Sequence, residues 1–262
     1  MPYLNDVILG VIEGITEFLP ISSTGHLLLA EQWLGARSDT YNIVIQAGAI
    51  LAVTLIYWRR LVDLALGWNQ PENRDYLIKL LAAFGITAVL GLVVKKLGFE
   101  LPETVTPIAW ALVIGGVWMI AAESLAARLP DSTRITWQVV IAVGIAQIVA
   151  GIFPGTSRSG ATIFAAMLLG TSNRAAATEF AFLVGIPTMY AASAYSLLKH
   201  SSNVDEDWTA LGIAFAVSTV TAFIAVKWLL GFIRSNRFTV FAVYRIVFGL
   251  LLLGLAWKGL VV

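Results

Sequence analysis

Long apolar runs alternate with short polar connectors along the chain, and this pattern predicts six helices that cross a membrane. A helix needs roughly 20 residues to cross a bilayer core about 30 Å thick. Six runs are long and apolar enough to do so, and we place them at residues 42–59, 76–97, 104–124, 174–199, 208–233 and 238–258. Polar connectors such as RRLVDLALGWNQPENRD separate the runs.

Two further apolar segments, residues 3–36 and 135–172, do not fit this pattern. Each has an apolar arm, a break rich in Pro, Gly, Ser, Thr and charged residues, and a second arm that is too short to cross. We predict two re-entrant hairpins, each made of two half-helices that enter and leave on one side. Irregular backbone at such depth is tolerated only where protein buries it or where it lines a wet cavity.

The two hairpin segments resemble each other, which predicts an internal repeat. A gapless alignment of EGITEFLPISSTG with QIVAGIFPGTSRS pairs Glu13 with Gln147, Pro20 with Pro154 and Ser23 with Ser157. Three spans follow each hairpin, and an odd number of spans forces the second half to insert upside down. We therefore expect one polytopic domain, residues 1–262, with inverted halves of about 1–130 and 131–262.

The composition confirms the class and excludes others. Hydrophobic residues make up 58% of the chain and charged residues 13%, with a mean hydropathy of +0.83. A soluble domain has about a quarter charged residues, so we expect an all-α integral membrane protein surrounded by membrane lipids. The formal charge of +1 and the lack of a basic block argue against a nucleic-acid partner. Cysteine is absent, which excludes disulfides and thiolate chemistry.

The distribution of Arg and Lys predicts the orientation, because cytoplasmic loops are richer in both. The predicted topology places the larger set on one side: Arg59, Arg60, Arg74, Arg128, Arg134, Arg174, Arg234 and Arg237. The smaller set lies on the other side: Arg37, Lys95, Lys96, Lys199 and Lys258. The first side is then cytoplasmic, and both termini and the first hairpin open to the outer side.

Carboxylates in the first hairpin are the first candidate chemistry. Glu13 and Glu17 are four residues apart and share one helix face, with Asp6 near that face. An intramembrane carboxylate costs roughly 2.5–3.5 kcal/mol and is functional by default. Two on one face repel unless they share a proton or a hard divalent cation such as Mg²⁺ or Ca²⁺. A wet helix face or a structural ion pair is the alternative.

The break of the first hairpin predicts an anion site. Pro20 stops the first arm, and Ser22, Ser23, Thr24 and Gly25 form the N-terminus of the second. Free backbone N–H groups and the helix dipole favour anions at that position. His26 lies three residues after Ser23, a spacing that allows a nucleophile and its base. A plain N-cap with a hydrogen-bonded histidine is the alternative.

The break of the second hairpin, PGTSRSGAT, has the same arrangement of a proline followed by hydroxyl residues, with an arginine in place of a histidine. Arg158 at bilayer depth needs an anionic partner, which is either a phosphate or a carboxylate such as Glu17. The hydroxyls come from Thr156, Ser157, Ser159 and Thr162. Neither break matches a Walker A loop, a zinc HExxH helix or a GxSxG elbow. Together the breaks predict a site for a lipid substrate that bears phosphate.

Both motifs resemble those of the undecaprenyl-diphosphate phosphatase family of bacterial membrane enzymes, the bacitracin-resistance type. EGITEFLPISSTGH fills every fixed position of the first family motif, and PGTSRSGAT fills the second. The intervening segments IQAGAILAV and EFAFLVGIP are also similar to the family, so the resemblance covers essentially the whole chain.

The resemblance implies an activity, a cofactor and a set of site residues. The family hydrolyses the C55 isoprenyl diphosphate to the monophosphate carrier and phosphate, which recycles the lipid carrier of peptidoglycan synthesis and confers bacitracin resistance. It implies a bacterial inner-membrane location and metal-dependent hydrolysis through Glu13 and Glu17. The implied catalytic residues are Glu17, Ser23, His26 and Arg158, and the expected substrate-binding residues are Ser22, Thr24, Gly25, Ser157, Ser159, Gly160 and Thr162.

Several alternatives stay open at this point. Ser23 is the nucleophile or orients a water, and His26 is base, acid or itself the nucleophile. A lipid-phosphate transporter or flippase is the alternative function, because inverted repeats with broken helices are its usual architecture. A carrier needs Arg158 and hydroxyls but no nucleophile. The sequence does not determine the oligomeric state, for which a homodimer is one option.

Overall fold

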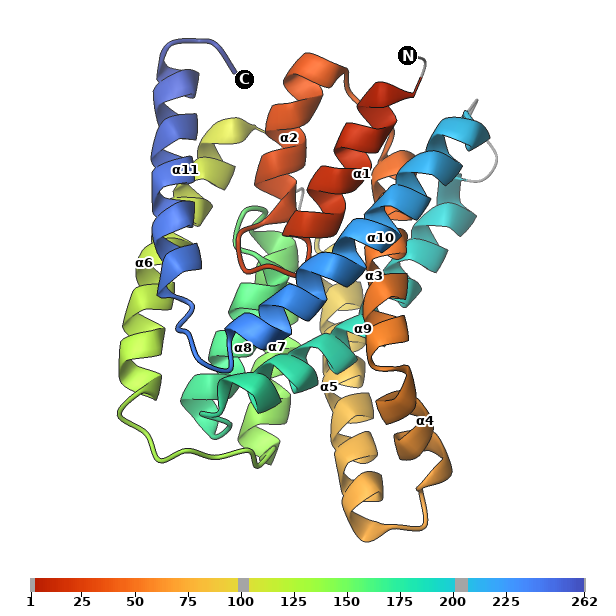
Figure 1. Cartoon of the computed structure of the whole chain (residues 1–262), viewed down its shortest axis with the longest axis vertical. Helices are drawn as coiled ribbons and strands as arrows, with labels where there is room; N and C mark the ends of the chain where they lie inside the picture. Colours follow the sequence, from red (N-terminus) through yellow and green to blue (C-terminus); the bar gives the residue numbers. More distant parts are fainter. Residues whose placement is uncertain (1–2, 99–103, 201–206, 262) are drawn as a thin grey trace.

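The computed structural model describes residues 3–98, 104–200 and 207–261, and within these ranges the protein is all-helical (Figure 1). The helices are α1 Leu4–Thr16, α2 Ser23–Leu34, α3 Asp39–Ile56, α4 Trp58–Leu66, α5 Pro71–Lys96, α6 Val105–Ala126, α7 Trp137–Ile152, α8 Arg158–Leu169, α9 Arg174–His200, α10 Trp208–Phe232 and α11 Thr239–Trp257. The start of α1 and the end of α11 lie at one end of the molecule, and the turn between α4 and α5 lies at the other.

The six predicted spans are confirmed as α3, α5, α6, α9, α10 and α11, each long and apolar enough to cross a membrane. Their outward faces carry large apolar side chains, such as Leu92 on α5, Ile114 on α6 and Ile224 on α10. These side chains have no protein partner to cover them, and lipid is the solvent that suits them. Parts of two predicted connectors, 99–103 and 201–206, lie outside the described residues.

One helix was not predicted. The connector RRLVDLALGWNQPENRD contains most of α4 and the start of α5. Of the residues in α4 only Leu64 is buried, so the apolar signal of this helix is too narrow to separate it from a polar loop. Helix α5 begins at Pro71, where a proline is tolerated because the first N–H of a helix has no intrahelical partner.

The two predicted hairpins are pairs of short helices, α1 with α2 and α7 with α8. These helices have 13, 12, 16 and 12 residues, respectively. At 1.5 Å per residue each is at most about 24 Å long, which is less than a bilayer core of about 30 Å. Their lengths agree with the re-entrant reading, and the entry and exit on one side stay a prediction.

The packing of the helices supports the inverted repeat. If α1, α2 and α3 of the first half correspond to α7, α8 and α9 of the second, then α5 and α6 correspond to α10 and α11. The contact of α1 with α10 then has its counterpart in that of α7 with α5, and α3 with α10 in α9 with α5. Helix α3 also packs on α9, and α6 packs on α11. In each of these two pairs a helix packs on its own counterpart in the other half.

Helix α1 is held close to α10 by glycines. A Cβ on Gly14 would lie 2.5 Å from the carbonyl oxygen of Ser218 and 2.8 Å from the amide nitrogen of Ala222. A Cβ on Gly10 would lie 2.6 Å from the carbonyl oxygen of Ala214. These obstacles are backbone atoms, which cannot rotate away. Small residues four apart are the usual means by which membrane helices approach closely.

We predict that Gly14→Ala pushes α1 away from α10 and destabilises the protein by about 1–3 kcal/mol, the usual cost of overpacking. The activity that the family resemblance implies should fall as well, because Gly14 lies between Glu13 and Glu17. Thermal unfolding in detergent measures the first effect. Gly212→Ala on α10 is the matched control, since nothing lies within 4 Å of its added Cβ. Equal unfolding midpoints for the two variants would contradict the prediction.

Candidate active site

The two breaks present the N-termini of α2 and α8 in the same backbone conformation. The residues before these helices, Ser22 and Ser157, have φ values of 73° and 68°, and among the described non-glycine residues they alone have positive φ. Such a conformation costs of order 1–3 kcal/mol and persists only where its surroundings impose it. The same strained residue at both N-caps supports the repeat and points to a functional site.

This geometry corrects the gapless alignment of the two motifs. Ser22 corresponds to Ser157, because both precede a helix of 12 residues, and therefore Ser23 corresponds to Arg158. The second break has one residue more than the first between its proline and its N-cap. The pairing of Ser23 with Ser157 was wrong because an alignment without gaps cannot show that insertion.

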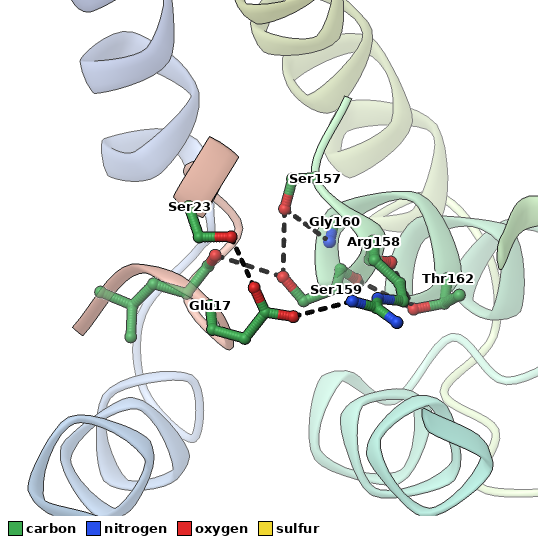
Figure 2. Close-up of polar contacts among 8 residues, drawn as sticks. Glu17, Ser23, Ser157, Arg158, Ser159, Gly160 and Thr162 are labelled. Carbon is green, nitrogen blue, oxygen red and sulfur yellow. Dashed lines mark hydrogen bonds and ion pairs between the residues drawn. The ribbon is translucent and has the colours of Figure 1, made fainter. Parts of the chain in front are cut away.

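Glu17 joins the two breaks (Figure 2). Its Oε2 accepts a hydrogen bond of 2.5 Å from the Ser23 hydroxyl, and its Oε1 accepts one of 3.0 Å from Nη2 of Arg158. Ser23 and Arg158 are the first residues of α2 and α8, so one carboxylate contacts the N-termini of both half-helices. Of the two partners considered for Arg158, the carboxylate is the one that it contacts.

Hydroxyls of the second break hold it against the first. Ser159 donates to the carbonyl oxygen of Leu19 at 3.2 Å and lies 3.1 Å from the Ser157 hydroxyl. Ser157 caps α8 by accepting from the N–H of Gly160 at 3.3 Å. Thr162 donates to carbonyl oxygens one turn back in its own helix. These hydroxyls therefore fix the loop, and Ser159 and Thr162 are buried.

A cavity of about 450 Å³ lies between the breaks, and we call it the phosphate cavity. The predicted residues that line it are Glu17, Ser22, Ser23, Thr24, Ser157 and Arg158. Ser22 holds the N-cap position of α2 but makes no side-chain cap bond, so the first N–H groups of α2 lack that partner. An arginine, hydroxyls and helix N-termini around one cavity suit a phosphate group.

A second cavity, of about 310 Å³, shares Ser23, Thr24 and Gln46 with the first. We call it the acidic cavity, because Glu13, Glu31 and Asp39 line it together with Asn42. Its lining carries no Arg or Lys. The two cavities thus meet at Ser23, and only the phosphate cavity has a positive charge in its lining, that of Arg158.

Glu13 fits the predicted cation. It is 1% exposed, and its Oε1 has no hydrogen-bond partner. Glu17 is its electrostatic neighbour, and either a shared proton or a shared cation would relieve the repulsion between two carboxylates. No group of three or more acidic or histidine side chains with metal-binding geometry occurs among the described residues. A hard cation here would take two carboxylates and complete its shell with water and phosphate oxygens, as Mg²⁺ often does.

His26 lies apart from Ser23. Its Nδ1 is 2.7 Å from the carbonyl oxygen of Ser22, and its Nε2 is 2.7 Å from the hydroxyl of Tyr244. The ring also stacks on Phe248, with centroids 4.3 Å apart. A carbonyl only accepts, so Nδ1 carries the proton and Nε2 of the neutral ring accepts from Tyr244. The predicted Ser23–His26 pair is not formed, since Ser23 donates to Glu17; His26 instead holds the strained N-cap.

Other predicted residues also lie outside the lining of the phosphate cavity. Gly25 faces α6, where a Cβ would be 3.2 Å from Leu112, and Ser159, Gly160 and Thr162 serve the loop as described. Residues that we did not predict line it instead: Gln46, Gln147 and Thr188. The sequence contains one indication of Gln147, which aligns with Glu13. It contains none of Tyr244, the partner of His26.

These features define a class, a polytopic membrane protein with an anion site where two broken helices meet. The chain belongs to the family of the bacitracin resistance protein BacA, whose model matches residues 6–251. A Rhizobium johnstonii protein named undecaprenyl-diphosphatase is 76% identical over 264 residues, covering 100% of both chains. A Stenotrophomonas maltophilia protein of the same name is 62% identical over 253 residues, covering 95% of this chain and 96% of that one.

The contacts of His26 predict its tautomer. In ring ¹⁵N NMR spectra His26 should show a protonated Nδ1 and a bare Nε2, and Tyr244→Phe should shift the Nε2 signal because it removes the donor. The chain has only two histidines, so in a His200→Gln background both ring nitrogen signals belong to His26. A protonated Nε2 with a bare Nδ1 would contradict the geometry.

Proposed function

We propose that this chain hydrolyses undecaprenyl diphosphate to undecaprenyl phosphate and inorganic phosphate, which recycles the lipid carrier and gives resistance to bacitracin. The observation that carries the proposal is that Ser23 and Arg158, held by one carboxylate, line the same cavity. The full-length similarity to proteins named undecaprenyl-diphosphatase supports the substrate.

Arg158 and the N-termini of α2 and α8 bind the diphosphate. A diphosphate in the cavity offers Arg158 a second anionic partner, and the planar guanidinium can contact phosphate and carboxylate together. Phosphoryl transfer needs positioning and charge stabilisation above all. Thr24 is exposed to the cavity and can donate to a phosphate oxygen.

Ser23 is the proposed nucleophile and Glu17 its base, a role that the sequence assigned to His26. The Ser23 oxygen bonds to the terminal phosphorus as its proton passes to Oε2 of Glu17, already 2.5 Å away. The bond from that phosphorus to the bridging oxygen breaks, and undecaprenyl phosphate leaves. A water oxygen then bonds to the phosphorus and the bond from phosphorus to the Ser23 oxygen breaks. The protons of the water stay on the released phosphate, and Glu17 returns its proton to the serine oxygen.

Glu13 and Glu17 would hold the divalent cation, Mg²⁺ or Ca²⁺. Bound there, the cation supplies positive charge for phosphate oxygens. Glu13 brings a buried oxygen that has no other partner.

The proposal includes location and assembly. The enzyme lies in the bacterial inner membrane with the phosphate cavity opening to the periplasmic side, which the Arg and Lys bias supports. The homodimer is part of the proposal too, and light scattering of the purified protein in detergent tests it.

Removing either Ser23 or Glu17 should abolish the activity. We expect Ser23→Ala to lower kcat by several orders of magnitude, as loss of a nucleophile does, and Glu17→Gln by about 10²–10⁴-fold, as loss of a general base does. Phosphate release from undecaprenyl diphosphate measures both. Glu31→Gln, in the acidic cavity, is the matched control and should stay close to wild type. A loss of tenfold or less for Ser23→Ala would assign Ser23 to orienting a water.

Adding a chelator tests whether the activity needs a divalent cation. Assaying the purified protein in detergent tests whether it is an enzyme or a transporter. Phosphate release should stop in excess chelator and return when Mg²⁺ or Ca²⁺ is added; full activity in chelator would overturn the cation. Release by purified protein in detergent, where no second compartment exists, supports the enzyme. A transporter of lipid phosphates would bind the substrate there without releasing phosphate.

A further inference from the structure

Arg245 is a buried arginine that the proposed reaction does not use. It lies on α11 and is 1% exposed. Its Nη1 donates to the carbonyl oxygen of Thr156 at 2.8 Å, and its Nη2 donates to that of Gly155 at 2.9 Å. Nη2 also donates to the carbonyl oxygen of Ala111 on α6 at 3.2 Å. The guanidinium therefore ties the second break to two spanning helices.

The charge of Arg245 has no carboxylate partner among the ion pairs of the described residues. Its acceptors are three carbonyl oxygens and the sulfur of Met119, and its Nε has none. A buried charge that lacks a counter-ion is costly. An apolar side chain would fill the space at lower cost, so the guanidinium is retained for what its donors hold.

The protein makes room for this guanidinium with a glycine of α6. A Cβ on Gly115 would overlap with Nη2 of Arg245. Gly155 has a φ of 93°, a conformation that glycine adopts without strain. One of the carbonyl groups that Arg245 binds thus belongs to a turn that glycine makes possible.

The second break separates two cavities. Gly155, Ser157 and Arg158 line the phosphate cavity on one side. Thr156 and Arg245 line a mostly apolar cavity of about 390 Å³ on the other. Arg245 does not line the phosphate cavity, so it acts on that cavity through the loop. Carbonyl oxygens facing a phosphate would repel it, and Arg245 binds two of the loop's carbonyl oxygens on the far side.

We propose that Arg245 is a positioning residue, which fixes the carbonyl groups of Gly155 and Thr156 so that the N-terminus of α8 and Arg158 face the phosphate. This inference rests on the proposed function, which identifies the bound anion as a diphosphate. The first break is held differently, by Ser159 on Leu19 and His26 on Ser22. The two halves of the repeat thus use different side chains for the same task.

The experiment measures the binding of inorganic pyrophosphate to the purified full-length protein in detergent by calorimetry, and kcat and KM for undecaprenyl diphosphate. Arg245→Lys keeps the charge but loses the fork. We expect about tenfold weaker pyrophosphate binding and a similar rise in KM, the order expected for loss of one charge-assisted hydrogen bond. Gly115→Ala does not change Arg245 itself, but the added Cβ displaces the guanidinium. This variant should therefore weaken pyrophosphate binding and raise KM by a similar factor.

Two controls separate positioning from stability. Arg174→Lys changes another structural arginine, which pairs with Glu123 and lines neither the phosphate nor the acidic cavity. Gly254→Ala adds a Cβ on α11 that meets nothing within 4 Å. Both controls should bind pyrophosphate within about twofold of wild type, a difference well below one hydrogen bond, even where the unfolding midpoint falls.

The outcomes are distinct. Wild-type affinity in both Arg245→Lys and Gly115→Ala, or an equal loss in Arg174→Lys, would overturn the inference, as would no pyrophosphate binding by the wild type. A wild type that binds pyrophosphate in an Arg245-dependent manner but releases no phosphate would leave the inference standing and overturn the proposed function.

Discussion

The site depends on a single carboxylate placed between two helix N-termini. Glu17 accepts from Ser23 at the start of α2 and from Arg158 at the start of α8. The helices come from opposite halves of the repeat, and each N-terminus is electropositive. Two electropositive N-termini repel each other, and the negative charge of Glu17 between them relieves this repulsion and joins the two halves. The same contacts place a hydroxyl and a guanidinium beside one cavity, so the contact that joins the two breaks also forms the site.

The two predicted halves match in the backbone of their breaks and differ in the side chains that the breaks carry. Ser22 and Ser157 adopt the same positive φ before helices of equal length. The residues that follow differ, because Ser23 supplies a hydroxyl where Arg158 supplies a positive charge. The residues that brace the two loops differ as well, with His26 in one and Arg245 in the other. Two copies of one scaffold thus provide the two kinds of group that phosphoryl transfer requires.

The sequence by itself determined the six apolar spans and the two polar breaks between short helices. Spans, breaks and the inverted repeat follow from apolar length and from proline and glycine, because a bilayer satisfies backbone groups only within helices or in buried breaks. Glu13, Glu17, Ser23 and Arg158 were predicted for the same reason, since polar residues at that depth are too costly to be incidental.

Only the tertiary structure decided which of these residues meet. Spacing along one helix suggested that Ser23 pairs with His26, but the partner of Ser23 is Glu17, on the other side of the break. The partner of His26, Tyr244, is 218 residues away in sequence. Arg245 was not singled out in the sequence, and its contacts with Gly155 and Thr156 come from helix packing. A local pattern fixes the face on which a side chain lies, whereas its partner depends on which helices pack together.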